Sequence, residues 1–136
     1  MISQPPSLVK FMQNEKNASE WTTWINSLYR YVTETGRQEL TVSGSVTKGV
    51  ESIELNHATV VVAATIADAV NHAGLFVVKN TSASGTAAHT CTLTSGTWDG
   101  TNTVATLNAS GEALAVYFDS NGDGIILENI GSVGLT

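Results

Sequence analysis

Apolar residues recur at helical spacing in the first part of the chain. In the segment EWTTWINSLYRYVTETG, residues 20–36, successive apolar positions lie three or four residues apart, which places them along one stripe of a helix. The stripe consists of Trp21, Trp24, Ile25, Leu28, Tyr31 and Val32. Asn17 and Glu20 have the spacing of a capping box, and Gly36 is a typical helix stop. We therefore predict an N-terminal α-helix within residues 7–35.

This apolar stripe needs a surface to pack against. A helix of this length is marginal in water by itself. Each tryptophan left in water would forgo roughly 1.5–3 kcal/mol of burial free energy. We therefore predict that residues 1–38, a short extended arm followed by the helix, form an anchor or oligomerisation segment whose stripe is covered by other chains.

After Gly36 the pattern changes to short runs of β-branched and apolar residues separated by turn signals, which is typical of a sandwich or barrel. The candidate strands are ELTVSGSVT (39–47), GVESIELN (49–56), ATVVVAAT (58–65), GLFVVKN (74–80), AHTCTLT (88–94), TVATLN (103–108), EALAVYF (112–118) and GIILEN (124–129). The intervening segment TIADAVNHAG (65–74) is predicted to hold a short helical turn or a loop. The predicted fold is mainly β: an antiparallel β-sandwich or jelly-roll-like domain over residues 39–136, preceded by the N-terminal α-helix.

Alternation is clearest in EALAVYF. Leu114, Val116 and Phe118 share one face of the predicted strand, and Ala115 and Tyr117 share the other. Because both faces carry apolar residues, the pattern fits a strand that is buried on one side or lies at an interface on both.

Composition narrows the classes of function. Charged residues make up 13% of the chain, against about 25% in typical domains. The net charge of -6 and the lack of any run of Lys or Arg argue against a nucleic-acid partner. No stretch reaches the roughly 20 apolar residues needed to span a bilayer, so we expect no membrane insertion. With no secretory leader and a single cysteine, Cys91, the chain is expected to be made in the cytoplasm without a disulfide.

The segment DSNGDG, residues 119–124, has the pattern closest to a known metal site. Asp119, Asn121 and Asp123 have the alternating spacing of the oxygen ligands that open an EF-hand loop. The position of the bidentate Glu is occupied by Ile130, and predicted strands replace the flanking helices. Asp, Asn and Gly are also the residues that a tight β-hairpin selects. We favour a plain turn, with calcium bound by these three residues as the alternative and no other cofactor expected.

Trp98 lies beside Asp99 and Asn102 in the segment GTWDGTN. An exposed indole beside polar side chains would form a platform for a sugar, which makes these three residues the possible ligand-binding set. The pair Asp99-Gly100 is equally a hairpin turn, and tryptophan is commonly buried. Packing of Trp98 in the core or at an interface is therefore favoured over contact with a ligand.

The chain carries no signature of catalysis. A Ser, Thr or Cys nucleophile needs a base nearby, and the sequence contains no nucleophile elbow. Glu51 and Glu54 lie close in sequence, but strand alternation points them to opposite faces. His89 and Cys91 share one strand face, yet no known ligand spacing joins them to a further metal ligand. We therefore predict a protein that is not an enzyme.

The β portion from GLFVVKN to NIGSV, residues 74–133, resembles small fibre, head-fibre and decoration modules of tailed bacteriophages. In such modules a polar, Thr-rich sheet ends with a strand pair over a turn similar to DSNGDG. The segment EWTTWINSLYRYV, residues 20–32, resembles the short anchoring segments that precede them.

This resemblance implies a homotrimeric structural protein of the virion: a head fibre, a tail fibre or a capsid decoration protein. Its N-terminal segment would attach to capsid, portal or tail proteins while the β domain projects outward. A trimer rather than a dimer follows from the resemblance, not from the helical spacing. The alternative is a carbohydrate-binding host-recognition module of a short tail fibre, whose partner would be a host surface glycan.

Overall fold

The computed structural model describes residues 36–83 and 87–136, together with Thr23. Within these residues, Arg37–Thr136 folds as one compact unit that is mainly β. Its elements are β1 (Arg37–Leu40), β2 (Gly44–Ser45), β3 (Ser52–Leu55), β4 (Ala63–Ile66), the 3-10 helix η1 (Ala69–His72), β5 (Gly74–Asn80), β6 (His89–Leu93), β7 (Val104–Leu107), β8 (Ala113–Phe118), β9 (Gly124–Ile130) and β10 (Gly134–Leu135). The predicted N-terminal helix falls, apart from Thr23, outside the described residues. Among the residues described, no helix is long and apolar enough to cross a membrane.

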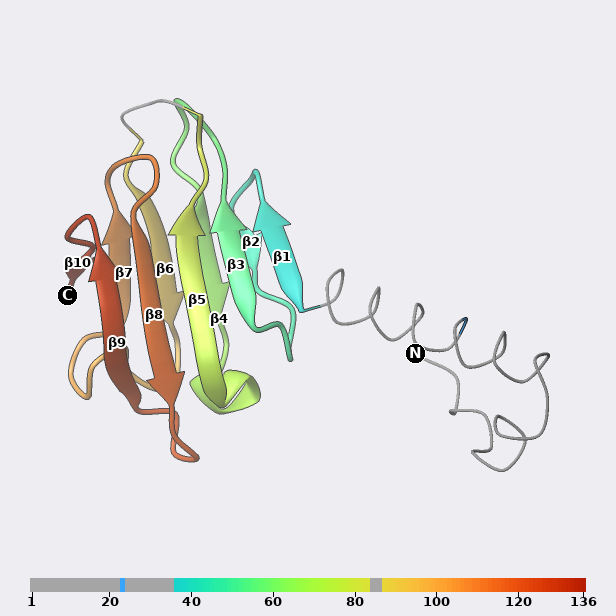
Figure 1. The fold of residues 1–136 in the computed structure, drawn as a ribbon, viewed down its shortest axis with the longest axis vertical. Helices are drawn as coiled ribbons and strands as arrows, with labels where there is room; N and C mark the ends of the chain where they lie inside the picture. The colour runs from blue at the N-terminus through green and yellow to red at the C-terminus, as the bar shows by residue number, and fades with distance from the viewer. Residues whose placement is uncertain (1–22, 24–35, 84–86) are drawn as a thin grey trace. The chain divides into compact units, whose positions relative to one another are not determined.

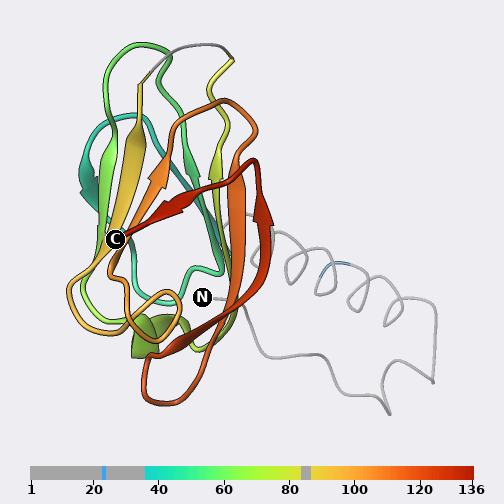
Figure 2. The ribbon, with the colours of Figure 1, turned by 90° about the vertical axis from the view of Figure 1, so that its left-hand side faces the viewer.

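Two five-stranded sheets face one another in a sandwich-like arrangement (Figure 1, Figure 2). Sheet A has the strand order β1-β3-β5-β8-β9, and sheet B has the order β10-β7-β6-β4-β2. From β1 to β6 the chain alternates between the sheets, and the pairings β1–β3, β3–β5, β2–β4 and β4–β6 are parallel. Later in the chain the hairpins β6–β7 and β8–β9 are antiparallel, as are the pairings β5–β8 and β7–β10. Both sheets are therefore mixed.

The antiparallel, jelly-roll-like topology predicted from the sequence is wrong for this reason. Short strands separated by turns suggest hairpins, but in the first half of the chain the turns lead into the opposite sheet. The segment 39–47, predicted as one strand, illustrates the difference, because β1 ends in sheet A at Leu40 and β2 begins in sheet B at Gly44. Parallel neighbours require such crossover connections.

Several elements agree more closely with the prediction. Strand β5 has the predicted bounds of 74–80. The predicted helical turn is confirmed as η1, which begins after Asp68, whose carboxylate accepts a hydrogen bond from the Val70 amide at 3.1 Å. The predicted strand 58–65 is displaced, since β4 begins only at Ala63. The short strand β10 was not predicted.

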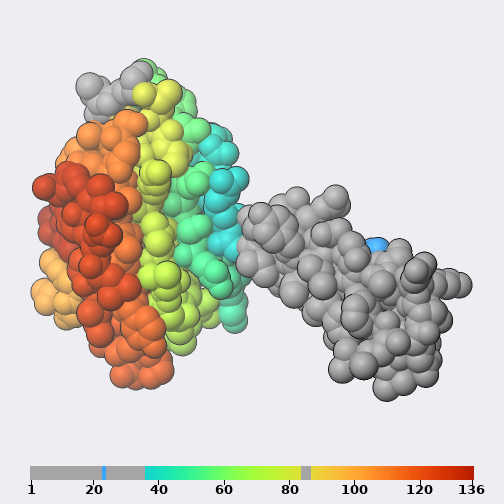
Figure 3. Space-filling model, in the orientation of Figure 1, coloured from blue at the N-terminus to red at the C-terminus, as the bar shows by residue number. Residues whose placement is uncertain are grey.

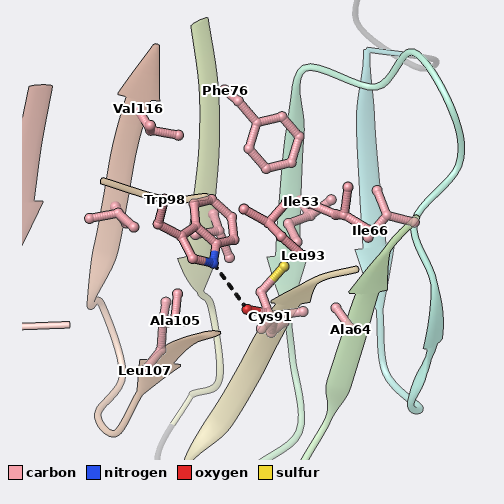
Figure 4. Packing of buried hydrophobic residues seen from close by; sticks show 14 of the residues in the cluster. Ile53, Ala64, Ile66, Phe76, Cys91, Leu93, Trp98, Ala105, Leu107 and Val116 are labelled. Atoms are coloured by element: carbon pink, nitrogen blue, oxygen red, sulfur yellow. Dashed lines mark hydrogen bonds between the residues drawn. The ribbon is translucent and has the colours of Figure 1, made fainter. Parts of the chain in front are cut away.

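The core lies between the sheets and centres on three aromatic side chains. The ring centroid of Trp98 lies 5.6 Å from that of Phe118 and 6.3 Å from that of Phe76. Such aromatic pairs add about 0.5–1.5 kcal/mol beyond the area that they bury. Aliphatic side chains from both sheets belong to the same cluster: Ile53, Val78, Leu114 and Val116 from sheet A, and Ile66, Leu93, Ala105 and Leu107 from sheet B. Figure 4 shows part of this cluster, with Ile53, Leu93 and Val116 near Trp98.

The loop that carries Trp98 is tied to the β8–β9 hairpin. The Thr97 amide donates a hydrogen bond to the Gly122 carbonyl at 3.0 Å, and the Gly124 amide donates one to the Thr97 carbonyl at 2.8 Å. The approach is so close that a Cβ atom on Gly124 would lie 2.2 Å from the Trp98 carbonyl oxygen. Position 124 therefore requires glycine because any side chain would collide with the Trp98 backbone.

We expect Gly124→Ala to lower the free energy of unfolding by about 1–3 kcal/mol or more, the usual effect of forcing extra atoms into a packed site. Gly44→Ala is the matched control, because Gly44 also begins a strand and a Cβ there meets nothing within 4 Å. Urea unfolding followed by circular dichroism at one protein concentration measures both. Equal stability of the two variants would show that the hairpin does not press on the Trp98 loop.

Candidate functional site

The outer face of sheet A carries an exposed apolar surface. Five of the nine exposed large hydrophobic side chains in the described part of the chain lie on β5, β8 and β9, with 47% to 60% of each side chain exposed. We call this surface the apolar face; it consists of Leu75, Tyr117, Ile125, Leu127 and Ile130. Contiguous exposed apolar patches on a folded domain commonly mark interaction sites.

Strand register sets the layout of the apolar face. Leu75 pairs with Tyr117, and Tyr117 pairs with Ile125, so the three side chains form one row across β5, β8 and β9. Directly opposite side chains on one face have Cβ atoms about 4.5–5.5 Å apart, so the row is continuous. A β-bulge interrupts the β8–β9 register, with Leu127 as the extra residue, and Leu127 and Glu128 are both exposed there.

The apolar face occupies only one half of the sheet. Figure 3 views sheet A from outside, with β5, β8 and β9 running from yellow-green to red. The other half, β1 and β3, is polar: the Arg37 guanidinium lies 3.3 Å from the Glu54 carboxylate. The outer surface of β1 and β3 is therefore charged, whereas β5, β8 and β9 are mainly apolar on this side, with Lys79 on β5 and Glu128 on β9 as exposed charged residues.

Sequence reasoning singled out only one member of the apolar face, Tyr117, as an outward residue of EALAVYF. The signal for the others lies in GLFVVKN (74–80) and GIILENI (124–130), where apolar residues occupy both faces of a strand. A sheet with one buried face would show strict alternation. Runs without alternation predict that the second face is covered as well, and no described segment covers it in a single copy.

The six predicted anchor residues, Trp21, Trp24, Ile25, Leu28, Tyr31 and Val32, lie outside the described residues. Their role in anchoring or oligomerisation stays a prediction.

Trp98 is a core residue. Its side chain is 0% exposed, and its indole Nε1 donates hydrogen bonds to the carbonyl oxygens of Thr103 at 3.1 Å and Cys91 at 3.3 Å (Figure 4). The ring is thus packed in the core, and its Nε1 is hydrogen-bonded within the protein. Of the two interpretations drawn from the sequence, core packing is correct, and Trp98 offers no exposed ring for a sugar.

Asp99 and Asn102 remain at the surface but bind each other. One carboxylate oxygen of Asp99 accepts the amides of Thr101 at 3.0 Å and Asn102 at 2.7 Å, and the other accepts the Asn102 side-chain amide at 2.8 Å. These hydrogen bonds, with that of the Asn102 amide first, lower the pKa of Asp99. The two side chains close the loop that Trp98 begins, and they do not join its indole in one site.

The segment 119–124 forms the hairpin turn between β8 and β9. One carboxylate oxygen of Asp119 accepts the amides of Asn121 at 2.8 Å and Asp123 at 3.0 Å, and a carboxylate oxygen of Asp123 accepts the Thr97 hydroxyl at 3.0 Å. The residues that resemble calcium ligands therefore stabilise the turn. Within the described residues, no three His, Cys, Asp or Glu side chains gather as a metal site.

A buried serine–histidine pair lies at the start of β6. His89 is 0% exposed, and its Nε2 lies 2.9 Å from the Ser82 hydroxyl, a distance that also occurs in nucleophilic catalysis. Here, however, the Val62 amide donates to Nδ1 at 3.0 Å, so the proton of the neutral ring is on Nε2 and points at Ser82. The Ser82 hydroxyl donates its own proton to the His57 carbonyl at 3.1 Å. The histidine cannot remove that proton, so the pair holds loops together instead of activating a nucleophile.

Comparisons add no functional assignment, since no protein-family model, curated protein or solved structure matches the chain. The site must be interpreted from its own residues. The residues that the sequence suggested as sugar or calcium ligands make hydrogen bonds within the fold, in the core, in the 98–102 loop and in the 119–124 turn. The apolar face is the largest group of exposed apolar side chains among the described residues, and nothing in the single described chain covers it.

The His89 network predicts a pH-dependent stability. Burial lowers the pKa of His89 below its ordinary value of 6.5, while the unfolded chain binds the proton near that value. Below pH 6.5 the unfolded state therefore binds more protons at His89 than the folded state does, so the contribution of His89 to the free energy of unfolding should fall as the pH decreases below 6.5 and should be constant above it. Urea unfolding at a series of pH values measures this dependence.

His89→Asn removes the titrating group and keeps an oxygen that can accept the Val62 amide. We expect this variant to lose less stability on acidification than the unmodified protein. If His89→Asn and the unmodified protein lose the same free energy between neutral and mildly acidic pH, another group controls the effect.

Proposed function

We propose that this chain is a structural protein of a tailed-bacteriophage particle, acting by self-association and docking and not by catalysis. It is a trimeric fibre-like or decoration protein with an N-terminal helix that docks on the capsid or the head-tail region of the virion. Residues Arg37–Thr136 project from that anchor as a β-sandwich domain. The observation that carries the proposal is the apolar face, which a second copy would cover.

The size of the apolar face is enough to favour association but not enough to give a micromolar dissociation constant by itself. Its five large side chains are about half exposed, so each can gain on the order of 1 kcal/mol from complete burial. Together they offer about 5 kcal/mol, whereas a micromolar dissociation constant corresponds to about 8 kcal/mol. The apolar face therefore contributes to a stable oligomer but needs a further contact, and the apolar stripe predicted in residues 20–36 is one source.

The bacteriophage part of the proposal rests on the resemblance of residues 74–133 and 20–32 to fibre and decoration modules. The non-catalytic part is supported by the polarity of the Ser82–His89 hydrogen bond, which leaves the serine without a base. The carbohydrate-binding alternative has less support, because Trp98 is buried and Asp99 and Asn102 bind one another. No described surface combines an exposed aromatic ring with these polar groups.

Light scattering coupled to size exclusion tests the self-association directly. We expect the 14.3 kDa chain to form a trimer at micromolar concentration, and Tyr117→Lys to weaken it at least tenfold because a charge would be buried at the centre of the apolar row. Thr101→Lys, at an exposed position of the 98–102 loop, is the control and should leave the trimer intact. A well-folded monomer across the micromolar range would overturn the proposal.

A second experiment tests the predicted anchor. Replacing Trp21 and Trp24 together by Ala should shift assembly to higher concentration, because the two largest side chains of the stripe are removed, while the β signal in circular dichroism stays unchanged. Asn26→Ala, at a position off the stripe, is the control. Assembly that is the same in all three proteins would remove residues 20–36 from the contact.

A further inference from the structure

A second exposed apolar group lies away from the apolar face. Val42 is 72% exposed in the connection between β1 and β2, and Val60 and Val61 are 58% and 48% exposed just before β4. Two hydrogen bonds join these loops: the Ser43 hydroxyl donates to the Val61 carbonyl at 3.5 Å, and the Ala63 amide donates to the Ser43 hydroxyl at 2.9 Å. We call Val42, Val60 and Val61 the valine cluster.

The two segments that hold the valine cluster contain no charged residue. Neither LTVSGSVT, residues 40–47, nor ATVVVAATIA, residues 58–67, contains Asp, Glu, Lys or Arg. The side chains next to the three valines are mainly Ala, Ser and Thr. Covering this surface would therefore remove no ionised group of these segments from water, and the high cost of burying an unpaired charge does not arise for them.

The two apolar surfaces lie toward opposite edges of the sandwich. The apolar face covers β5, β8 and β9, and β9 is one edge of sheet A, with β1 at the other edge. Val42 lies in the connection between β1 and β2, and Val60 and Val61 lie in the connection between β3 and β4, the neighbours of β1 and β2 in their sheets. The valine cluster of one Arg37–Thr136 unit is therefore not placed to cover the apolar face of the same unit, and both surfaces are exposed among the described residues.

We propose that the valine cluster of one copy packs on the apolar face of the next copy in a head-to-tail contact. The inference rests on the proposed self-association and specifies its surfaces. One kind of contact then covers eight of the nine exposed large hydrophobic side chains of the described residues. A contact between two apolar faces would leave the valine cluster in water.

Head-to-tail contact also has a consequence for symmetry. It joins two different surfaces, so every copy uses both, and the contact either closes into a ring or continues as a filament. The valine cluster then supplies apolar area that the apolar face lacks by itself. A ring of three copies is the closed form that agrees with the proposed trimer.

Cysteine cross-linking tests which surfaces meet. Tyr117→Cys places a thiol in the apolar face, and Val61→Cys places one in the valine cluster. The native Cys91 is 0% exposed and burial raises the pKa of its thiol, so it does not compete for oxidation. The two full-length variants are co-expressed, oxidised mildly and separated on a non-reducing gel.

We expect covalent dimers to be at least tenfold more abundant in the mixture of Tyr117→Cys and Val61→Cys than in either variant alone. Thr101→Cys in place of Val61→Cys is the control and should give none. If light scattering shows an oligomer but Tyr117→Cys links only to itself, or to nothing, the head-to-tail contact is wrong and self-association stands. If the protein is a monomer, both proposals fail.

Discussion

A two-sheet sandwich has one interior, while every strand turns alternate side chains away from it. In β5 and β8 both sets are largely apolar: Phe76 and Phe118 fill the core, and Leu75 and Tyr117 point outward. Tighter packing of the interior cannot bury the outward side chains, because the strand pairing fixes which side chains face outward. The exposed apolar face is thus a consequence of sheet geometry acting on this sequence, and the proposals for self-association depend on it.

Much of the β-structure was predictable from local pattern. The strand at 74–80 was placed correctly because Gly74 and Asn80 flank the β-forming run LFVVK, and the alternation of 112–118 identified its inward face. Strand direction was not predictable. A turn such as that near Gly44 has the same residues whether it returns the chain to its neighbour or leads it to the other sheet, so the parallel pairings have no local signature.

In the candidate site, too, some features were predictable from the sequence and others were not. The turn at 119–124 followed from its Asp, Asn and Gly residues, whereas the burial of Trp98 depends on a hairpin more than twenty residues later, where Gly124 leaves room for the Trp98 carbonyl. The pair of Ser82 and His89 could not be assigned a role from the sequence, because its role is decided by the direction of one proton. That direction is set by the Val62 amide, which a distant loop supplies.

Protection of the sheet edges bears on what kind of association is possible. Sheet B ends in β2 and β10, which have two residues each, and sheet A ends in β1, with Arg37 and Glu39, and in β9, with a bulge beside Glu128. Short strands, charges and bulges are the devices that prevent strand addition at an edge. Pairing through backbone edges would add copies in any register, whereas contact through side chains has a register set by their shapes. A chain that blocks its edges but leaves an apolar face exposed is therefore suited to assembly in a fixed register, and this favours a contact between faces and loops over one between strands.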